Sequence, residues 1–161
     1  MFRKMRRFRQ ELSQEETVAI LERGSSGVLA VSGDDGYPYA VPLSYVFADG
    51  KIIFHCAKQG HKLDAIRNND KVSFCVVDRD DVKAQEYTTY FASVIVFGRA
   101  RIVEDDGEKR AAICTLAEKY RPGHEEERAA AVDREFGGMS IVEIQIEHMT
   151  GKEAIELTKR R

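Results

Sequence analysis

The fold is decided by the stretch from Asp35 to Lys62, which reads DGYPYAVPLSYVFADGKIIFHCAKQGHK. It contains two Asp-Gly pairs, Asp35-Gly36 and Asp49-Gly50, between runs rich in β-branched and aromatic residues. An Asp-Gly pair flanked by such runs is a strong short-range signal for a β-hairpin turn. The two turns predict three consecutive antiparallel strands, over Gly27–Ser32, Tyr37–Phe47 and Lys51–Cys56.

Pro38 and Pro42 lie inside the second of these predicted strands. A proline has no N–H to donate to a neighbouring strand, so we expect this strand to be bulged, or exposed along one side, at those points. Backbone groups left unpaired there are free to contact a ligand. An ordinary edge strand that carries two prolines is the alternative interpretation.

The end of the stretch predicts an anion site. Gly60 bends the chain from the third strand into a helix predicted over residues 61–69, and the first N–H groups of a helix have no partner within it. His61 and Lys62 add cationic side chains where the helix dipole disfavours them, by roughly 0.3–1 kcal/mol each when charged. A bound phosphate would remove that conflict. A solvated lysine on a surface helix is the alternative.

The rest of the chain predicts further helices and strands. A capping-box pattern at Ser13-Gln14-Glu15-Glu16 begins a helix that continues to about Arg23. The other predicted elements are a strand at Lys71–Asp78, a polar, mobile stretch at Arg79–Thr89, a strand at Tyr90–Glu104, a helix from Asp105 to Tyr120, a charged helix at His124–Phe136 and a strand at Ile141–Glu147. We therefore expect a fold that is mainly β with flanking helices (α+β). Its six or more mostly antiparallel strands should close into a barrel, since closure removes exposed edges.

Length and composition indicate one globular domain over residues 1–161, with a basic N-terminal arm at 1–10 and a C-terminal tail at 153–161. A hydrophobic content of 43% is enough for a sizeable core. The net charge of −2 argues against nucleic acid as a partner. No apolar run approaches the roughly 20 residues that span a bilayer, and no signal-peptide core follows the basic arm. The predicted location is the cytoplasm, with no membrane partner.

Several chemistries lack their motifs. The cysteines Cys56, Cys75 and Cys114 are scattered and fit reduced thiols, and the histidines show no metal-binding spacing, so no metal site is expected. Phosphate-binding GxxxxGK[ST] and GxGxxG loops and the hydrolase GxSxG motif are missing. Cys56 follows His55 directly, and adjacent strand residues point to opposite faces, so the two side chains should not pair.

A cofactor site fits the residues better. A flavin or a similar heterocycle needs an anion pocket, backbone groups along the ring edge and an apolar wall. The turn at Gly60–Lys62 offers the first, and the proline-interrupted segment Ala40–Ser44 the second. Ser93 adds a hydroxyl donor if its strand lies beside the anion turn. The apolar wall is predicted from Tyr39, Tyr45, Tyr90 and Phe91.

Three segments together resemble the nitroimidazole-resistance branch of the pyridoxamine 5'-phosphate oxidase-like flavoproteins. They are Asp35–Tyr45, Ile53–Asp64 and Tyr90–Gly98, and their order and spacing match that branch. The resemblance extends from about Met5 to Lys152. The paired arginine and histidine motif of true pyridoxamine phosphate oxidases is missing near the C-terminus, so vitamin B6 oxidation is not expected.

The resemblance implies a split β-barrel of the FMN-binding type, as a homodimer with FMN in clefts at the subunit interface. Backbone groups of Val41–Ser44 would line the flavin ring, and Lys62 would contact the phosphate. His55 is the best candidate for a residue that contacts substrate or tunes the flavin. Ser93 and Val94 would complete the pocket, from the same subunit or from its partner. The implied cofactor-binding residues are Val41, Pro42, Leu43, Ser44, His55, Ala57, Lys58, Gly60, His61, Lys62, Ser93 and Val94.

The implied activity is that of an FMN-dependent oxidoreductase, a nitroreductase-like enzyme that passes electrons to a small planar acceptor such as a nitroimidazole or another nitroaromatic. One alternative is a non-enzymatic flavin- or haem-binding protein that acts as a sensor, store or electron carrier, with His55 or His61 as the haem ligand. Another keeps the barrel but binds a deazaflavin or leaves the cleft empty.

Overall fold

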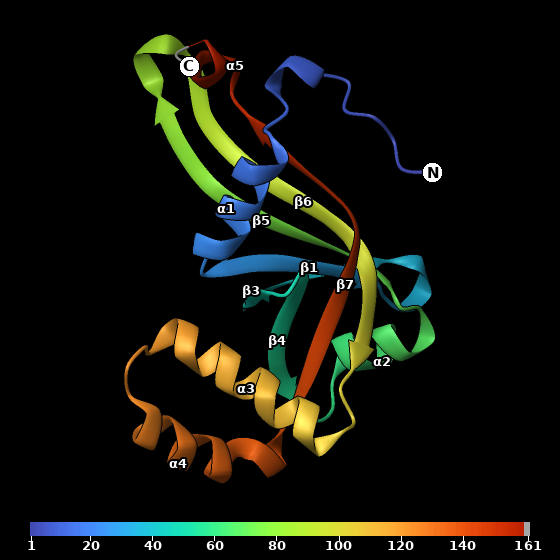
Figure 1. Cartoon of the computed structure of the whole chain (residues 1–161). Coiled ribbons are helices and arrows are strands. Elements are labelled where there is room, and N and C mark those ends of the chain that lie inside the picture. Colours follow the sequence, from blue (N-terminus) through green and yellow to red (C-terminus); the bar gives the residue numbers. More distant parts are fainter. Residues whose placement is uncertain (160–161) are drawn as a thin grey trace.

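The computed structural model describes residues 1–159, and within them seven strands form one antiparallel sheet with helices around it (Figure 1). The strands are β1 (Ser26–Ser32), β2 (Pro38–Ser44), β3 (Val46–Ala48), β4 (Lys51–Ala57), β5 (Lys71–Lys83), β6 (Thr88–Ile102) and β7 (Met139–Glu153). The helices are α1 (Gln14–Arg23), α2 (His61–Asn68), α3 (Asp106–Tyr120), α4 (Glu125–Glu135) and α5 (Ile155–Thr158). The predicted class, mainly β with flanking helices, is confirmed.

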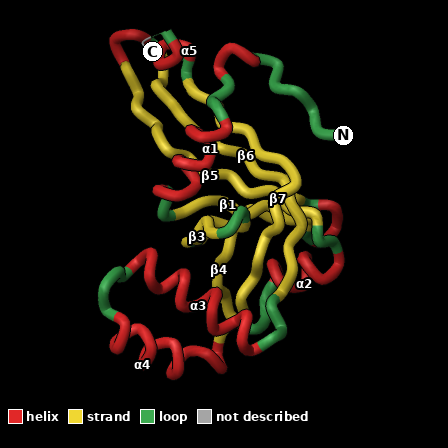
Figure 2. The backbone as a smooth tube through the Cα atoms, in the orientation of Figure 1, coloured by secondary structure: helices red, strands yellow, loops and turns green. Residues whose placement is uncertain are grey.

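The sheet curls until its two edge strands come close together. Its strand order is β2-β1-β5-β6-β7-β4-β3, so β2 and β3 are the outermost strands, yet only Tyr45 separates them in the chain. The two edges must therefore lie close together, and the strongly coiled sheet in Figure 2 is a barrel with a split between them.

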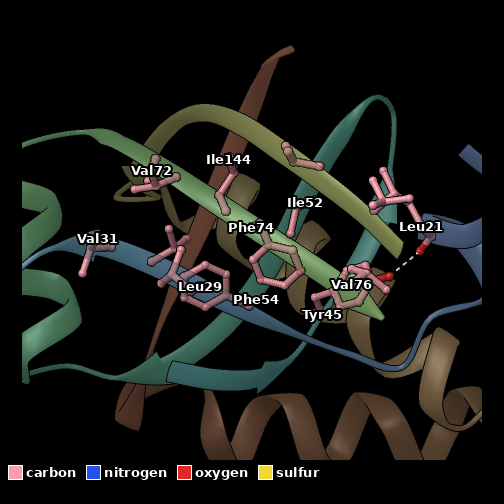
Figure 3. Packing of buried hydrophobic residues seen from close by; sticks show 14 of the residues in the cluster. Leu21, Leu29, Val31, Tyr45, Ile52, Phe54, Val72, Phe74, Val76 and Ile144 are labelled. Carbon is pink, nitrogen blue, oxygen red and sulfur yellow. Dashed lines mark hydrogen bonds between the residues drawn. The ribbon is translucent and has the colours of Figure 1, made fainter. Parts of the chain in front are cut away.

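The prediction of three neighbouring strands is wrong at Tyr45. The segment Tyr37–Phe47 is not one strand, because the chain leaves the ladder at Tyr45. The Tyr45 side chain is fully buried and its hydroxyl donates to the Leu21 carbonyl oxygen at 2.7 Å (Figure 3). Its backbone N–H donates to the Tyr120 hydroxyl at 2.9 Å instead of to a strand. Both Asp-Gly turns form hairpins, but the two hairpins end at opposite edges of the sheet.

The barrel interior is filled by apolar side chains that alternate along the strands. Phe54 of β4, Phe74 of β5 and Ile144 of β7 are fully buried there (Figure 3). Each such side chain contributes about 1.5–3 kcal/mol of hydrophobic stabilisation. Helix α1 packs against the barrel and begins with the predicted capping box, in which Ser13 and Glu16 cap each other's backbone N–H.

Helices α3 and α4 form a hairpin that covers the outer face of β3, β4 and β7, at the bottom of Figure 1. A second apolar cluster lies beneath them. It joins Ile113 and Leu116 of α3 and Val132 of α4 to strand residues such as Ile53 and Ile141. The first half of β7 is therefore covered on both faces, which explains why four consecutive residues, Ile141 to Ile144, are buried.

Strands β5 and β6 extend beyond the barrel as a two-stranded arm. The predicted polar stretch between strands at Arg79–Thr89 is mostly strand, since β5 continues to Lys83 and β6 begins at Thr88, with a short 3-10 turn at Ala84–Glu86 between them. Residues 77–82 of β5 are all exposed, and the four consecutive polar residues from Asp78 to Asp81 break the apolar alternation that marks a strand in sequence.

Both terminal segments pack on the sheet. In the basic arm, Phe2 stacks on His148 with ring centroids 4.8 Å apart, and the Gln10 side-chain amide donates to the Glu153 carbonyl oxygen at 2.8 Å. The predicted tail at 153–161 contains the last residue of β7 and helix α5, and its residues 160–161 lie outside the described part of the chain. Among the helices of residues 1–159, none has the length and apolar character needed to cross a membrane.

Candidate functional site

The split in the barrel holds a cavity of about 490 Å³. Strand β3 pairs only with Lys51–Ile53 of β4, so the second half of β4 has no strand on that side within residues 1–159. The cavity lies there, between β4 and β2. Its walls are Val41, Pro42, Leu43, His55, Cys56, Ala57, Lys62, Glu135, Gly138 and Met139. The structure thus brings six of the twelve predicted residues together, namely Val41, Pro42, Leu43, His55, Ala57 and Lys62.

Strand β2 presents an open edge to this cavity. It pairs with β1 in an unbroken register, with Pro38 opposite Ser32 and Pro42 opposite Val28. Strand β2 has no bulge, but it is exposed along one side, which was the other expectation. An edge strand tolerates proline where the N–H position faces away from its neighbour. Ala40 lies midway between the prolines, so by the alternation of an antiparallel ladder its N–H and C=O also face outward, free to bind a ligand.

A positively polarised corner lies at the start of α2. Gly60 has a φ of +143°, which favours glycine, and its carbonyl accepts from the N–H groups of Leu63 and Asp64 at 3.0 and 3.2 Å. The N–H groups of His61 and Lys62 have no protein acceptor among the described residues. The half-buried Lys62 forms no ion pair with any of residues 1–159. This corner can hold an anion such as a phosphate.

His61 points away from the cavity. Its ring stacks on Tyr39 with centroids 4.2 Å apart, and its Nε2 lies 3.7 Å from the Asp34 carboxylate, beyond hydrogen-bond distance. This Nε2 is the one buried side-chain nitrogen or oxygen without a hydrogen-bond partner in the described part of the chain. Lys58 and Gly60 are exposed in the bend before α2 and do not line the cavity.

Ser93 and Val94 lie outside this cavity in the single chain. Ser93 pairs with Val77 and Lys152 on the sheet, and the Val94 side chain is fully buried in the barrel core, with its backbone between the paired strands β5 and β7. None of the four residues predicted to form the aromatic wall, Tyr39, Tyr45, Tyr90 and Phe91, lines the cavity. Tyr45 fills the core, and Tyr90 is buried on the arm with its hydroxyl 2.7 Å from Glu86.

A second cavity, of about 570 Å³, lies under the α3–α4 hairpin. It shares His55, Glu135 and Met139 with the first and adds the predicted residue Ser44. Sequence reasoning did not find the contribution of α4 and β7 to either cavity. The available signal was the Gly137-Gly138 break, which places Met139 at the start of a strand.

His55 and Cys56 face opposite sides of β4, as predicted. Cys56 packs against the barrel core, whereas His55 is exposed and lines both cavities. Burial raises the pKa of the Cys56 thiol, and the charges of Lys62 and Arg67 partly oppose that rise. The thiol is therefore a weak nucleophile at neutral pH. Among residues 1–159, no group of three or more His, Cys, Asp or Glu is arranged to hold a metal ion.

Comparison with known proteins agrees with this fold. A family model described as pyridoxamine 5'-phosphate oxidase matches residues 13–153. No curated protein matches the sequence.

Three similar solved structures share the fold. The flavocytochrome Anf3 from Azotobacter vinelandii is 18% identical, with 94% of this chain and 72% of that chain covered and a TM-score of 0.81. A FAD-binding protein from Mesorhizobium loti is 26% identical, with 89% and 96% covered and a TM-score of 0.64. A candidate 5-nitroimidazole antibiotic resistance protein from Bacteroides thetaiotaomicron is 17% identical, with 89% and 86% covered and a TM-score of 0.74.

Proposed function

The chain belongs to the pyridoxamine 5'-phosphate oxidase family, and on this premise we propose that it is a flavoprotein that binds FMN in the cavity between β2 and β4. One observation carries the proposal. The cavity combines an open strand edge with Lys62 and the unpaired N–H groups at the start of α2. These are the groups that the ring and the phosphate of a flavin nucleotide require. The binding of FAD by the Mesorhizobium loti protein adds support.

Each part of the cavity has a role in this proposal. Lys62 and the N–H groups of the first turn of α2 bind the phosphate, and the outward backbone groups of Ala40 and Pro42 meet the polar edge of the ring. Val41 and Leu43 supply apolar surface. The flavin, when bound, supplies the redox chemistry, and the chain positions it and excludes water.

We further propose a homodimer with a cofactor site shared across the interface. On the outer face of β5 and β6, Val77, Ile95 and Phe97 are 62%, 44% and 41% exposed. Such an apolar face is unusual for the surface of a monomer. Ser93 lies opposite Val77 on the same face, so a second copy seated there would contact Ser93. The oligomeric state of Ile95→Lys, measured by light scattering, tests this proposal: a monomer is expected, and an unchanged dimer would contradict it.

We propose that the protein reduces small planar acceptors such as nitroimidazoles. This activity is the one that the resemblance to the nitroimidazole-resistance branch implies. The shared fold of the Bacteroides thetaiotaomicron protein and the exposed His55 beside the cavity support this activity. A non-enzymatic flavin- or haem-binding protein is the second candidate, which the likeness to a flavocytochrome favours.

The absorption spectrum of the protein as isolated tests the proposal. We expect flavin bands, release of FMN on denaturation, and reoxidation of the dithionite-reduced protein by a nitroimidazole under anaerobic conditions. Flavin binding without reoxidation would favour the second candidate, and a Soret band would identify haem. Colourless protein that fails to take up added FMN would contradict flavin binding.

A further inference from the structure

The cavity under the α3–α4 hairpin, here called the helical cleft, has mostly apolar walls. Ile113 and Leu116 come from α3, Val132 from α4 and Met139 from the start of β7. Its volume of about 570 Å³ is within the range of small-molecule sites. An apolar cleft of this size favours a ligand that buries a hydrophobic ring.

Two polar side chains meet this apolar wall from the barrel. They are His55 of β4 and Ser44 at the end of β2, and neither has a side-chain hydrogen bond with any of residues 1–159. His55 and Met139 also line the cavity assigned above to the flavin. A molecule in the helical cleft would therefore lie next to the flavin site, with its polar group within reach of His55.

The charged residues at the rim are already paired with one another. Arg121 lies 2.6 Å from Glu127, and Arg128 pairs with Glu118 and donates to the Arg121 carbonyl oxygen at 3.0 Å. Arg134 lies 3.4 Å from Glu135. A charged ligand would thus enter an apolar cleft without an unpaired counter-charge in the described lining, and burying such a charge is unfavourable.

We propose that the helical cleft binds a small, uncharged aromatic compound, held by its ring against α3 and α4 and by its polar group at His55. The role of this compound as a substrate of the flavin rests on the proposed function. The binding itself depends only on the cleft.

Ala131 and Ala130 provide a matched pair of variants. Both lie on α4, but Ala131 lines the helical cleft, whereas Ala130 is exposed and does not. Ala131→Phe fills the cleft, and Ala130→Phe makes the same change toward solvent. Ala117→Phe fills the cleft from α3 and serves as a second variant if Ala131→Phe fails to fold, as judged by circular dichroism.

The test is calorimetric titration with nitrobenzene and with its charged analogue 4-nitrobenzoate, on flavin-free and on FMN-loaded protein. We expect nitrobenzene to bind the natural protein and Ala130→Phe alike, and the cleft-filling variants at least about tenfold more weakly. We expect 4-nitrobenzoate to bind the natural protein at least about tenfold more weakly than nitrobenzene. All variants should keep the FMN affinity of the natural protein.

Three results would overturn the inference: no binding of nitrobenzene, equal binding by the cleft-filling variants, or tighter binding of the carboxylate. Because the flavin-free protein is titrated as well, a failure of FMN binding is seen separately and counts against the proposed function alone.

Discussion

The ammonium group of Lys119 donates a hydrogen bond to the carbonyl oxygen of Tyr45 at 3.0 Å and lies 4.3 Å from the centre of the Tyr45 ring. It also donates to the carbonyl oxygen of Gly24. The C-terminal end of α3 is thereby tied to the residue that joins β2 to β3. Tyr45 directly follows Ser44, which lines the helical cleft, and Leu43, which lines the cavity between β2 and β4.

Lys119→Met should lower the free energy of unfolding by about 1–3 kcal/mol, because it leaves the Gly24 carbonyl without its side-chain donor. Urea denaturation measures the change. Lys71→Met, at an exposed position, is the control and should be close to neutral. An unchanged midpoint for Lys119→Met would show that the anchor contributes no stability.

The buried hydroxyl of Tyr45 should lower the free energy of unfolding at high pH. Burial, followed by the influence of Tyr120 and Asp78, raises the pKa of its hydroxyl, whereas an unfolded tyrosine titrates near pH 10. Above about pH 10 the unfolded chain releases a proton that the folded chain keeps, so stability falls as pH rises.

The loss between about pH 8 and about pH 11 should be smaller in Tyr45→Phe, which has no proton to release at this site. Tyr37→Phe, at an exposed position, should keep the loss seen in the natural protein. Urea midpoints at the two pH values measure both. Equal losses in Tyr45→Phe and the natural protein would refute the assignment to Tyr45.

Cysteine labelling offers a test that needs no substitution. Cys114 is exposed, whereas Cys56 is half-buried and lines the cavity proposed for the flavin, and burial raises the pKa of the Cys56 thiol. Iodoacetamide should therefore label Cys114 first. Added FMN should slow the labelling of Cys56 further and leave Cys114 unaffected, as peptide mass spectrometry would report. Labelling of Cys56 at the same rate with and without FMN would argue against the cavity as the flavin site.

Gly60 is the position where a side chain should disturb the anion corner. Its φ of +143° is a conformation that alanine rarely adopts, so Gly60→Ala should cost about 1–3 kcal/mol or shift the start of α2. FMN affinity should fall with it. Gly137→Ala meets no atom within 4 Å and is the matched control. Fluorescence titration with FMN compares the two, and equal affinities would contradict a role for this bend.

The sequence predicted the local features well and the non-local ones poorly. The Asp-Gly turns, the capping box at Ser13 and helix α2 depend on neighbours in the chain, and all three are confirmed. The separation of β2 from β3 depends on the burial of Tyr45 against α1, which no local pattern encodes. The exposed arm of β5 reads as a loop because it has no buried face.

The candidate site also has parts that could be predicted from the sequence and parts that could not. The corner at Gly60–Lys62 and the proline-bearing edge could be found from residue types alone. His61 could not be placed, since its direction depends on stacking with Tyr39 across the β1–β2 turn. The wall from Glu135 and Met139 comes from segments about 80 residues away from β4, so its presence depends on packing.

The central claim is that the start of α2 binds the flavin phosphate, and Lys62→Glu tests it through two ligands that differ only in that phosphate. The natural protein should bind FMN more tightly than riboflavin, and Lys62→Glu should weaken FMN binding by about tenfold or more while riboflavin binding changes little. Lys71→Glu makes the same change of charge at an exposed position on β5 and should keep the preference for FMN. An undiminished preference for FMN in Lys62→Glu would contradict the account.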